Sequence, residues 1–187
     1  EFTLDNFEAS YSEAVDELLS KYEETSGINL FPKSKGKVAL KVNTRAGEGL
    51  STPLNLVRAT IKSLESRGFD RQSILIIDFS SFNLKASGFY KEEKEGSIYF
   101  EGCPVLALNS LKYFESDWFY DSPIPPLLKD RPYHIGSGSL SSDNVTPIYR
   151  QSFLPIPLLF EVDFWINLVV GIDDPVLGVD GVLANAS

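Results

Sequence analysis

The sequence predicts an α/β fold: a layered sheet built around a parallel strand, helix, strand unit. Two observations support this prediction. Apolar and polar side chains alternate over residues 37–43, and residues 73–79 form a nearly continuous apolar run, as in a strand covered on both faces. The segment between them has helical periodicity, so a right-handed crossover would set the two strands parallel. With 187 residues, the chain fits one domain over residues 1–187.

A first helix is predicted from residue 7 onward. Apolar side chains recur there every three or four residues, which gives a helix one apolar face, while Glu and Asp occupy the other. This apolar stripe comprises Phe7, Tyr11, Val15, Leu18 and Tyr22. Gly27 ends the helix, because glycine readily adopts the left-handed conformation found at helix C-termini.

A second helix is predicted after the loop that follows the first strand. Ser51 or Thr52 would be its N-cap and Pro53 its first residue. Its buried stripe would comprise Leu54, Val57, Ile61 and Leu64. Gly68 would end it.

The rest of the chain is less regular. Residues 104–109 and 162–170 are predicted as short strands, and the charged run at residues 91–95 as a solvated turn. Residues 110–157 are rich in proline and aromatic residues and predict an insertion with short strands or a lid. A turn region rich in Gly and Asp follows at residues 171–181.

Composition excludes several classes of function. Asp and Glu outnumber Lys and Arg by 26 to 17, and the net charge of −9 disfavours nucleic acid and anionic membranes as partners. No segment reaches the ~20 apolar residues of a membrane span. The single cysteine, Cys103, rules out an iron-sulfur cluster from this chain alone, and we expect a buried, inert thiol. Compartment and oligomeric state are left open.

Polar side chains follow the predicted strands where these strands end. Ligands of α/β sheets bind at the carboxyl ends of the strands, because loops and helix N-termini converge there. The candidate ligand-binding residues are Lys41, Asn43, Arg45 and Asn167, and the candidate metal ligands are Asp78, Asp173 and Asp174. Two cations, two amides and three carboxylates suit a small polar or anionic ligand, with or without a divalent metal. Asp78 with Asp173 or Asp174 could alternatively act as a general base. Simple turn and capping roles are the competing interpretation.

The loop over residues 44–52 has two glycines, Gly47 and Gly49, just before a predicted helix N-terminus. Free backbone amides and the helix dipole there could receive a phosphate or carboxylate. The loop lacks the Lys-Ser/Thr end of a phosphate-binding loop and the third glycine of a dinucleotide fingerprint. A tight strand-to-helix turn is therefore the alternative.

A second class of function is suggested by residues 113–126, where carboxylates alternate with large aromatic side chains. This composition is similar to the lining of a sugar site and would suit a non-catalytic glycan- or protein-interaction domain. A packing loop is the alternative, since large aromatic side chains dominate cores. Exposed, coplanar Trp118 and Tyr120 would favour the interaction surface, and a buried Trp118 would oppose it.

Three stretches resemble the domain of unknown function 362 (DUF362) family: residues 37–53 with the helix after them, residues 73–79 leading to Gly88 and Phe89, and residues 162–185. In the last stretch the matching positions are Asp163, Ile166, Asn167, Gly178, Gly181 and Asn185. The Lys and His of the family pattern are replaced, at about those places, by Ile172 and Asp174.

The resemblance implies an α/β domain with polar residues at its strand ends. Because some members of the family carry ferredoxin-like iron-sulfur modules, it also implies a third possible function, a redox-associated subunit of an iron-sulfur system. Any cluster would then belong to a partner or to a segment outside this chain. The matching stretch runs into the last residues, so we expect the native chain to continue past Ser187.

Overall fold

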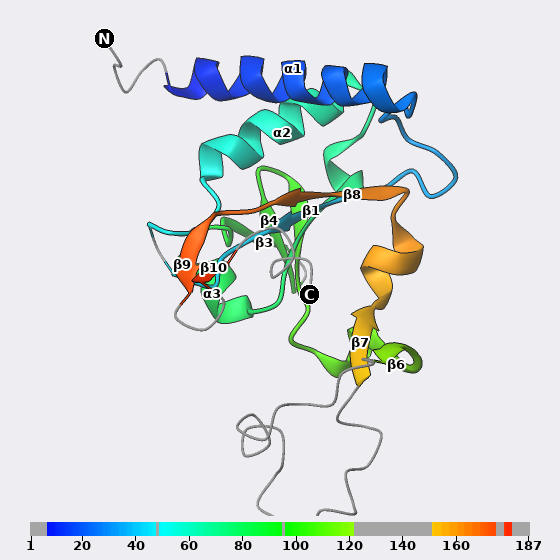
Figure 1. Ribbon diagram of the computed structural model, residues 1–187. Coiled ribbons are helices and arrows are strands. Elements are labelled where there is room, and N and C mark those ends of the chain that lie inside the picture. The colour runs from blue at the N-terminus through cyan, green and yellow to red at the C-terminus, as the bar shows by residue number, and fades with distance from the viewer. Residues whose placement is uncertain (1–6, 48, 95, 122–150, 175–177, 181–187) are drawn as a thin grey trace, which may run out of the picture.

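The computed structural model describes residues 7–47, 49–94, 96–121, 151–174 and 178–180. Its helices and sheet form layers (Figure 1). Helix α1 (Phe7–Ser26) lies over helix α2 (Leu54–Ser66), and both cover the same face of a six-stranded sheet. The predicted α/β class is therefore confirmed.

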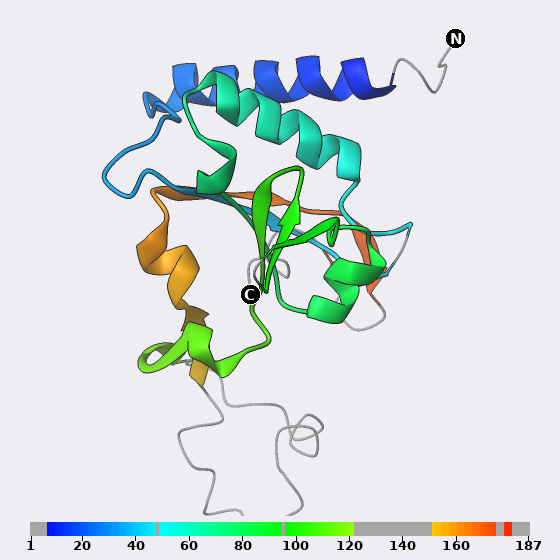
Figure 2. The ribbon, with the colours of Figure 1, turned by 180° about the vertical axis from the view of Figure 1, so that it is seen from behind.

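The sheet is mixed and mostly parallel, in the order β3-β4-β5-β2-β1-β8. Its parallel strands are β1 (Val38–Val42), β2 (Ile74–Asp78), β5 (Cys103–Ala107) and β8 (Phe164–Leu168). Strands β3 (Glu92–Lys94) and β4 (Ser97–Phe100) add an antiparallel hairpin beside β5. Strand β8 forms the edge nearest the viewer in Figure 1, and the β3–β4 hairpin forms the edge nearest the viewer in Figure 2.

The second half of the sheet differs from the prediction at two strands. The charged run over residues 91–95 was expected to be a solvated turn, but Glu92–Lys94 forms strand β3. Strand β4 was not predicted at all. Strand β4 pairs with β5, and β3 pairs with β4, so both depend on neighbours that a local pattern does not reveal. The charged β3 side chains stay exposed at the sheet edge.

The core lies on both faces of the sheet. Under α2, the helix side chains Val57, Ile61 and Leu64 pack on Leu40 and Ile76, and all five are fully buried or nearly so. Each such side chain contributes about 1.5–3 kcal/mol through burial. A smaller cluster covers the opposite face, with the members Ala39, Leu75, Ile77, Leu108 and Val162.

Helix α1 packs on α2 through only part of its apolar stripe. Val15 and Leu19 are buried against Ala59 of α2. In contrast, Leu18 is 68% exposed and Tyr22 is 47% exposed, so the predicted stripe is incompletely covered. The side chain of Phe7 lies outside the described residues.

The N-cap prediction for α2 is wrong. The helix starts at Leu54 after Pro53, with no side-chain cap. Thr52 is instead buried, and its hydroxyl accepts a hydrogen bond from the Asn43 N–H and donates one to the Leu168 carbonyl oxygen. This hydroxyl is thus committed to joining β1 and β8 rather than to capping the helix.

Short elements complete the described chain. They are the 3₁₀ turns η2 (Arg71–Ser73) and η3 (Leu111–Tyr113), helix α3 (Ser81–Ala86), the antiparallel pair β6 (Phe114–Asp121) and β7 (Gln151–Pro155), the π-helical turn η5 (Pro157–Glu161), and the antiparallel pair β9 (Ile172–Asp174) and β10 (Gly178–Asp180). The predicted insertion thus contains short strands. Among the described helices, none has the length and apolar character to cross a bilayer.

Candidate functional site

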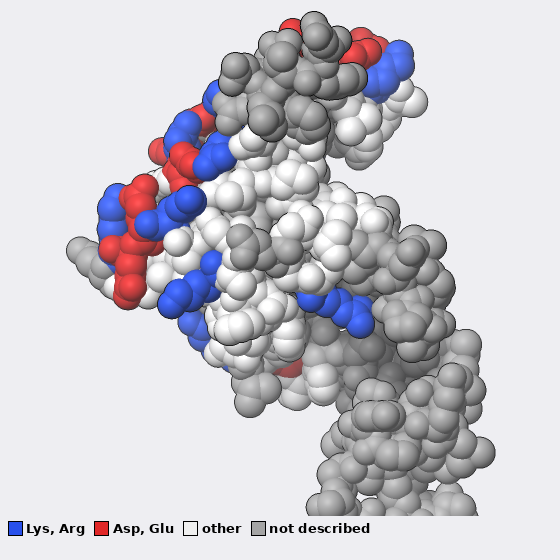
Figure 3. Space-filling model, turned by 90° about the vertical axis from the view of Figure 1, so that its left-hand side faces the viewer, with Lys and Arg blue, Asp and Glu red and all other residues white. Residues whose placement is uncertain are grey.

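Most of the predicted site residues lie at or just after the carboxyl ends of β1, β2 and β8. Because these strands are parallel, they end at the same edge of the sheet, on the side where β8 leads toward β9 (Figure 1). Figure 3 looks onto this side of the molecule. Charged side chains of both signs gather along one flank of this view, while the centre is mostly uncharged with isolated Lys and Arg side chains.

A buried ion pair joins the ends of β1 and β2. The Lys41 Nζ atom donates to Asp78 Oδ1 at 2.8 Å, and both residues are buried. The same Oδ1 atom accepts the Phe79 N–H at 2.8 Å. The other oxygen, Oδ2, accepts the Thr44 N–H at 2.9 Å and the Thr44 hydroxyl. Both carboxylate oxygens therefore have two donors each, which offsets the cost of removing this charge from water.

The end of β1 is also tied to β8. Thr52 Oγ1 lies 2.8 Å from the Asn43 N atom and 2.6 Å from the Leu168 O atom. The side chain of Asn43 is buried, and its Oδ1 accepts the Arg45 N–H at 3.2 Å. Four polar residues of the loop and strand ends are therefore buried together: Lys41, Asn43, Thr44 and Thr52, with Asp78 opposite them.

Asn167 shares a face of the sheet with Lys41. The two residues are direct partners in the register of β8 and β1, and partners in adjacent parallel strands project to the same side about 4.8 Å apart. Their side of the sheet is opposite α2, which contacts Leu40 and Val42. Arg45 follows in the loop and is exposed.

The structure thus joins Lys41 to Asp78 by a hydrogen bond, places Asn43 directly after β1, and aligns Asn167 with Lys41. Asp173 and Asp174 belong to β9, but their side chains lie outside the described residues. Among the residues that the structure does describe, no three His, Cys, Asp or Glu side chains come together as metal ligands.

The loop after β1 turns sharply at its glycines. Gly47 and Gly49 have φ angles of 82° and 85°, a left-handed conformation that favours glycine. The Gly47 N–H donates to Thr44 O and the Leu50 N–H to Gly47 O, so the loop consists of successive tight turns. Helix α2 then starts without an acidic residue in its first turn. Its first N–H groups carry the positive end of the helix dipole at this edge.

Sequence reasoning missed Thr44 and Thr52 as members of this cluster. The Thr44 hydroxyl donates to Asp78, and the Thr52 hydroxyl accepts the Asn43 N–H and donates to the Leu168 carbonyl oxygen. Their position in the sequence could have identified them, because each lies at one end of the loop that connects the carboxyl end of a strand to a helix. Thr52 was predicted only as a possible helix N-cap, and no role was predicted for Thr44.

Asp163, one of the family-like positions, has a structural role. Its carboxylate accepts N–H donors from Lys33 (2.7 Å), Lys35 (2.9 Å) and Gly36 (2.9 Å), which fixes the loop before β1 beside the start of β8. Partial burial acts to raise its pKa, but these three donors and the Lys33 charge together hold the pKa below its usual value.

Cys103 is fully buried in the core under α2. Burial raises the pKa of its thiol to about 12, although Arg71 acts in the opposite direction. A thiol of this kind is protonated at neutral pH and inert, as the sequence predicts.

Comparisons of the chain with protein-family models, with curated proteins and with solved structures found no match. The resemblance to the DUF362 family therefore stays a prediction.

Proposed function

We propose that this protein binds a small anionic ligand at the carboxyl ends of β1, β2 and β8. The observation that supports this proposal best is the buried Lys41–Asp78 pair with its threonine donors at that edge. Apolar residues of similar volume would serve stability equally well or better, so a buried ion pair needs another reason. Ligands of α/β sheets commonly bind at the carboxyl ends of the strands, and binding of a ligand would explain an ion pair at this position.

The charges around the pair suit an anion. Lys41 and Arg45 supply positive charge, and the first turn of α2, which contains no acidic residue, adds the positive end of the helix dipole. Asn43 and Asn167 would orient the ligand through their amides. In this proposal, Asp78 keeps the Lys41 ammonium in place.

The proposal also includes a divalent metal at the same site. Asp78 would have to exchange some of its present donors for the metal, with Asp173 or Asp174 as further ligands. The same carboxylates could alternatively serve as a general base.

The test is thermal unfolding in inorganic phosphate, with ionic strength held constant by NaCl. A ligand at 100 times its Kd stabilises the native state by about 2.7 kcal/mol, so we expect Tm to rise by several degrees. Arg45→Ala and Asn167→Ala should each reduce that rise. These positions are preferable to Lys41 and Asp78, whose replacement would itself destabilise the fold.

Lys62→Ala provides the matched control, because Lys62 is an exposed cation on α2 that lies outside the site. It should leave the phosphate effect unchanged. Absence of any rise in the unmodified protein, or an equal loss in the control variant, would contradict the proposal. A rise that needs added Mg²⁺ would support the metal as well.

A second candidate function rests on the aromatic side chains of β6 and β7. Trp118 is 44% exposed and packs edge-on against Phe160, with ring centroids 4.6 Å apart. Phe119 and Phe153 are also exposed and contact each other. The side chain of Tyr120 lies outside the described residues. Exposed aromatic groups of this kind favour a glycan- or protein-binding surface, and Trp118→Ala should abolish binding in a glycan-array screen.

A further inference from the structure

The two edges of the central sheet differ in how they are protected. Strand β3 is three residues long, and its sequence Glu-Glu-Lys is exposed. Short, charged edge strands prevent a sheet from pairing with another chain. Strand β8 forms the other edge with five residues, Phe164–Leu168, none of them charged or proline. Within the described part of the chain, no strand pairs with its outer edge.

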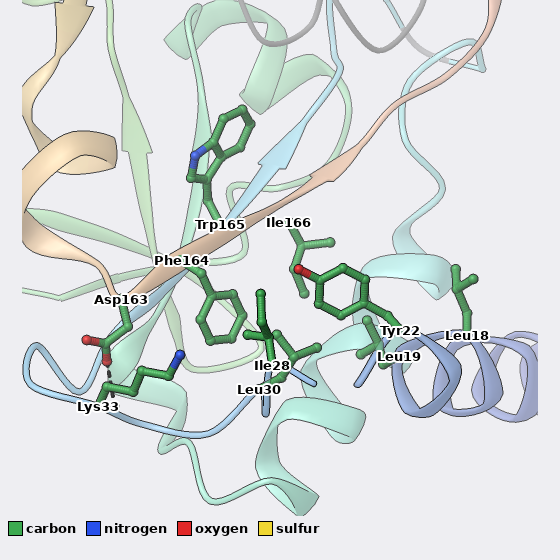
Figure 4. A pocket seen from close by; sticks show the side chains of 10 residues that line it. All are labelled: Leu18, Leu19, Tyr22, Ile28, Leu30, Lys33, Asp163, Phe164, Trp165 and Ile166. Atoms are coloured by element: carbon green, nitrogen blue, oxygen red, sulfur yellow. Dashed lines mark hydrogen bonds between the residues drawn. The ribbon is translucent and has the colours of Figure 1, made fainter. Parts of the chain in front are cut away.

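An apolar groove of about 620 Å³ runs along the β8 edge. It is bounded by α1, the loop after α1 and β8 itself. Figure 4 shows Phe164 and Ile166 directed from β8 toward Tyr22, Leu19 and Leu30, while Trp165 projects from the other face of the strand.

The exposed apolar residues of this edge amount to a substantial part of an interface. Leu18, Tyr22, Ile28 and Trp165 line the groove, and each is between 38% and 68% exposed. At about 150–250 Å² for an aromatic side chain, the exposed parts of Tyr22 and Trp165 together amount to roughly 170 Å², and Leu18 and Ile28 add further apolar area. A standard interface buries about 800 Å² per partner. The β8 backbone and its flanking residues can supply the remainder.

We propose that the β8 edge pairs with the β8 edge of a second copy of this chain. A twofold axis would set the two strands antiparallel and place Leu18 and Ile28 of each copy against the groove of the other. The two sheets would then form one continuous sheet, ending on both sides in the protected strand β3. Pairing of β8 with β3 would bring the charged β3 side chains against an apolar groove, so the association closes as a dimer.

The test is the oligomeric state of the full chain, measured by sedimentation equilibrium over a range of concentrations. We expect a dimer. Leu18→Glu and Ile28→Glu should each weaken it at least tenfold, because a carboxylate would be buried in an apolar interface. Both positions are exposed in the single chain, so the variants should fold, and circular dichroism checks this.

Phe82→Glu is the matched control, since Phe82 is 78% exposed on α3, away from the groove. It should leave the dimer intact. Hydrogen exchange of the β8 amides should slow as the dimer forms. A monomer at all concentrations, a dimer that resists both groove variants, or β8 amides that exchange equally fast in monomer and dimer would overturn the proposal. A monomer that instead binds a foreign peptide or an apolar small molecule in the groove would also overturn it.

Discussion

At the scale of single residues, Asp78 holds the candidate site together more than any other side chain. It accepts the Lys41 ammonium, the Thr44 N–H and the Phe79 N–H, and so fixes the ends of two strands and the start of two loops. Lys41 has a narrower role, because its removal would leave the carboxylate with its remaining donors. The two members of the ion pair should therefore differ in how much the fold depends on them.

We expect Asp78→Ala to lower the free energy of unfolding by about 3–5 kcal/mol, the usual cost of breaking a buried pair from one side. Lys41→Met should cost less, because the Thr44 and Phe79 donors still stabilise the carboxylate. Urea denaturation measures both values. A larger loss for Lys41→Met would show that charge compensation by the ammonium, and not hydrogen bonding to Asp78, dominates.

At the scale of elements, the helices end as their glycines predict. Gly88 follows α3, with a φ of 83°, and the neighbouring Phe89 N–H donates to Leu84 O. This is the bond pattern of a left-handed C-terminal cap. A Cβ atom at Gly88 would lie 3.3 Å from Leu54 Cδ1, whereas one at Gly27, after α1, would meet nothing within 4 Å.

Gly88→Ala should therefore destabilise the protein more than Gly27→Ala. Both variants force alanine into a left-handed conformation, which costs about 1 kcal/mol or more. Gly88→Ala must in addition displace Leu54 at the start of α2. Thermal unfolding of the two variants compares these costs directly. Equal losses would mean that Leu54 moves aside freely.

At the scale of the whole molecule, acidic side chains link segments that are distant in sequence. Asp163 binds the loop before β1 from the start of β8. Asp16 on α1 accepts hydrogen bonds from Ser63 of α2 and from Arg67 just after that helix, and these hydrogen bonds lower its pKa. The folded state therefore favours the charged form of both carboxylates. Their protonation should weaken the contacts between these segments and lower the stability of the fold.

The sign of the pH dependence follows from these lowered pKa values. A carboxylate with a lower pKa in the folded state stabilises it above the unfolded pKa of about 4, and this contribution is lost as the pH falls through the folded value. Stability should thus decrease below about pH 4. Asp163→Asn should be less stable at pH 7 and show a shallower decrease in acid. An unchanged acid profile in urea denaturation would contradict a role for Asp163.

Local patterns predicted much of the fold. Residues 37–43 and 73–79 contain β1 and β2, and the stripe from Leu54 to Leu64 belongs to α2. The β3–β4 hairpin was missed because its charged, exposed residues resemble a turn until β5 provides a partner. In the candidate site, the strand-end rule selected Lys41, Asn43 and Asp78. It missed the threonines, whose partners are distant in sequence.

The sequence by itself determined the α/β class, the strand-helix-strand core and the inert cysteine, because periodicity and burial preference are local properties. Only the tertiary structure decided that Lys41 pairs with Asp78, that Thr52 joins the ends of two strands and that α1 leaves Leu18 exposed near the outer edge of β8, which no described strand covers. Strand order and helix placement set these contacts, and both depend on pairing between residues distant in the chain. A one-dimensional pattern records which side chains are apolar, but not which neighbour covers them.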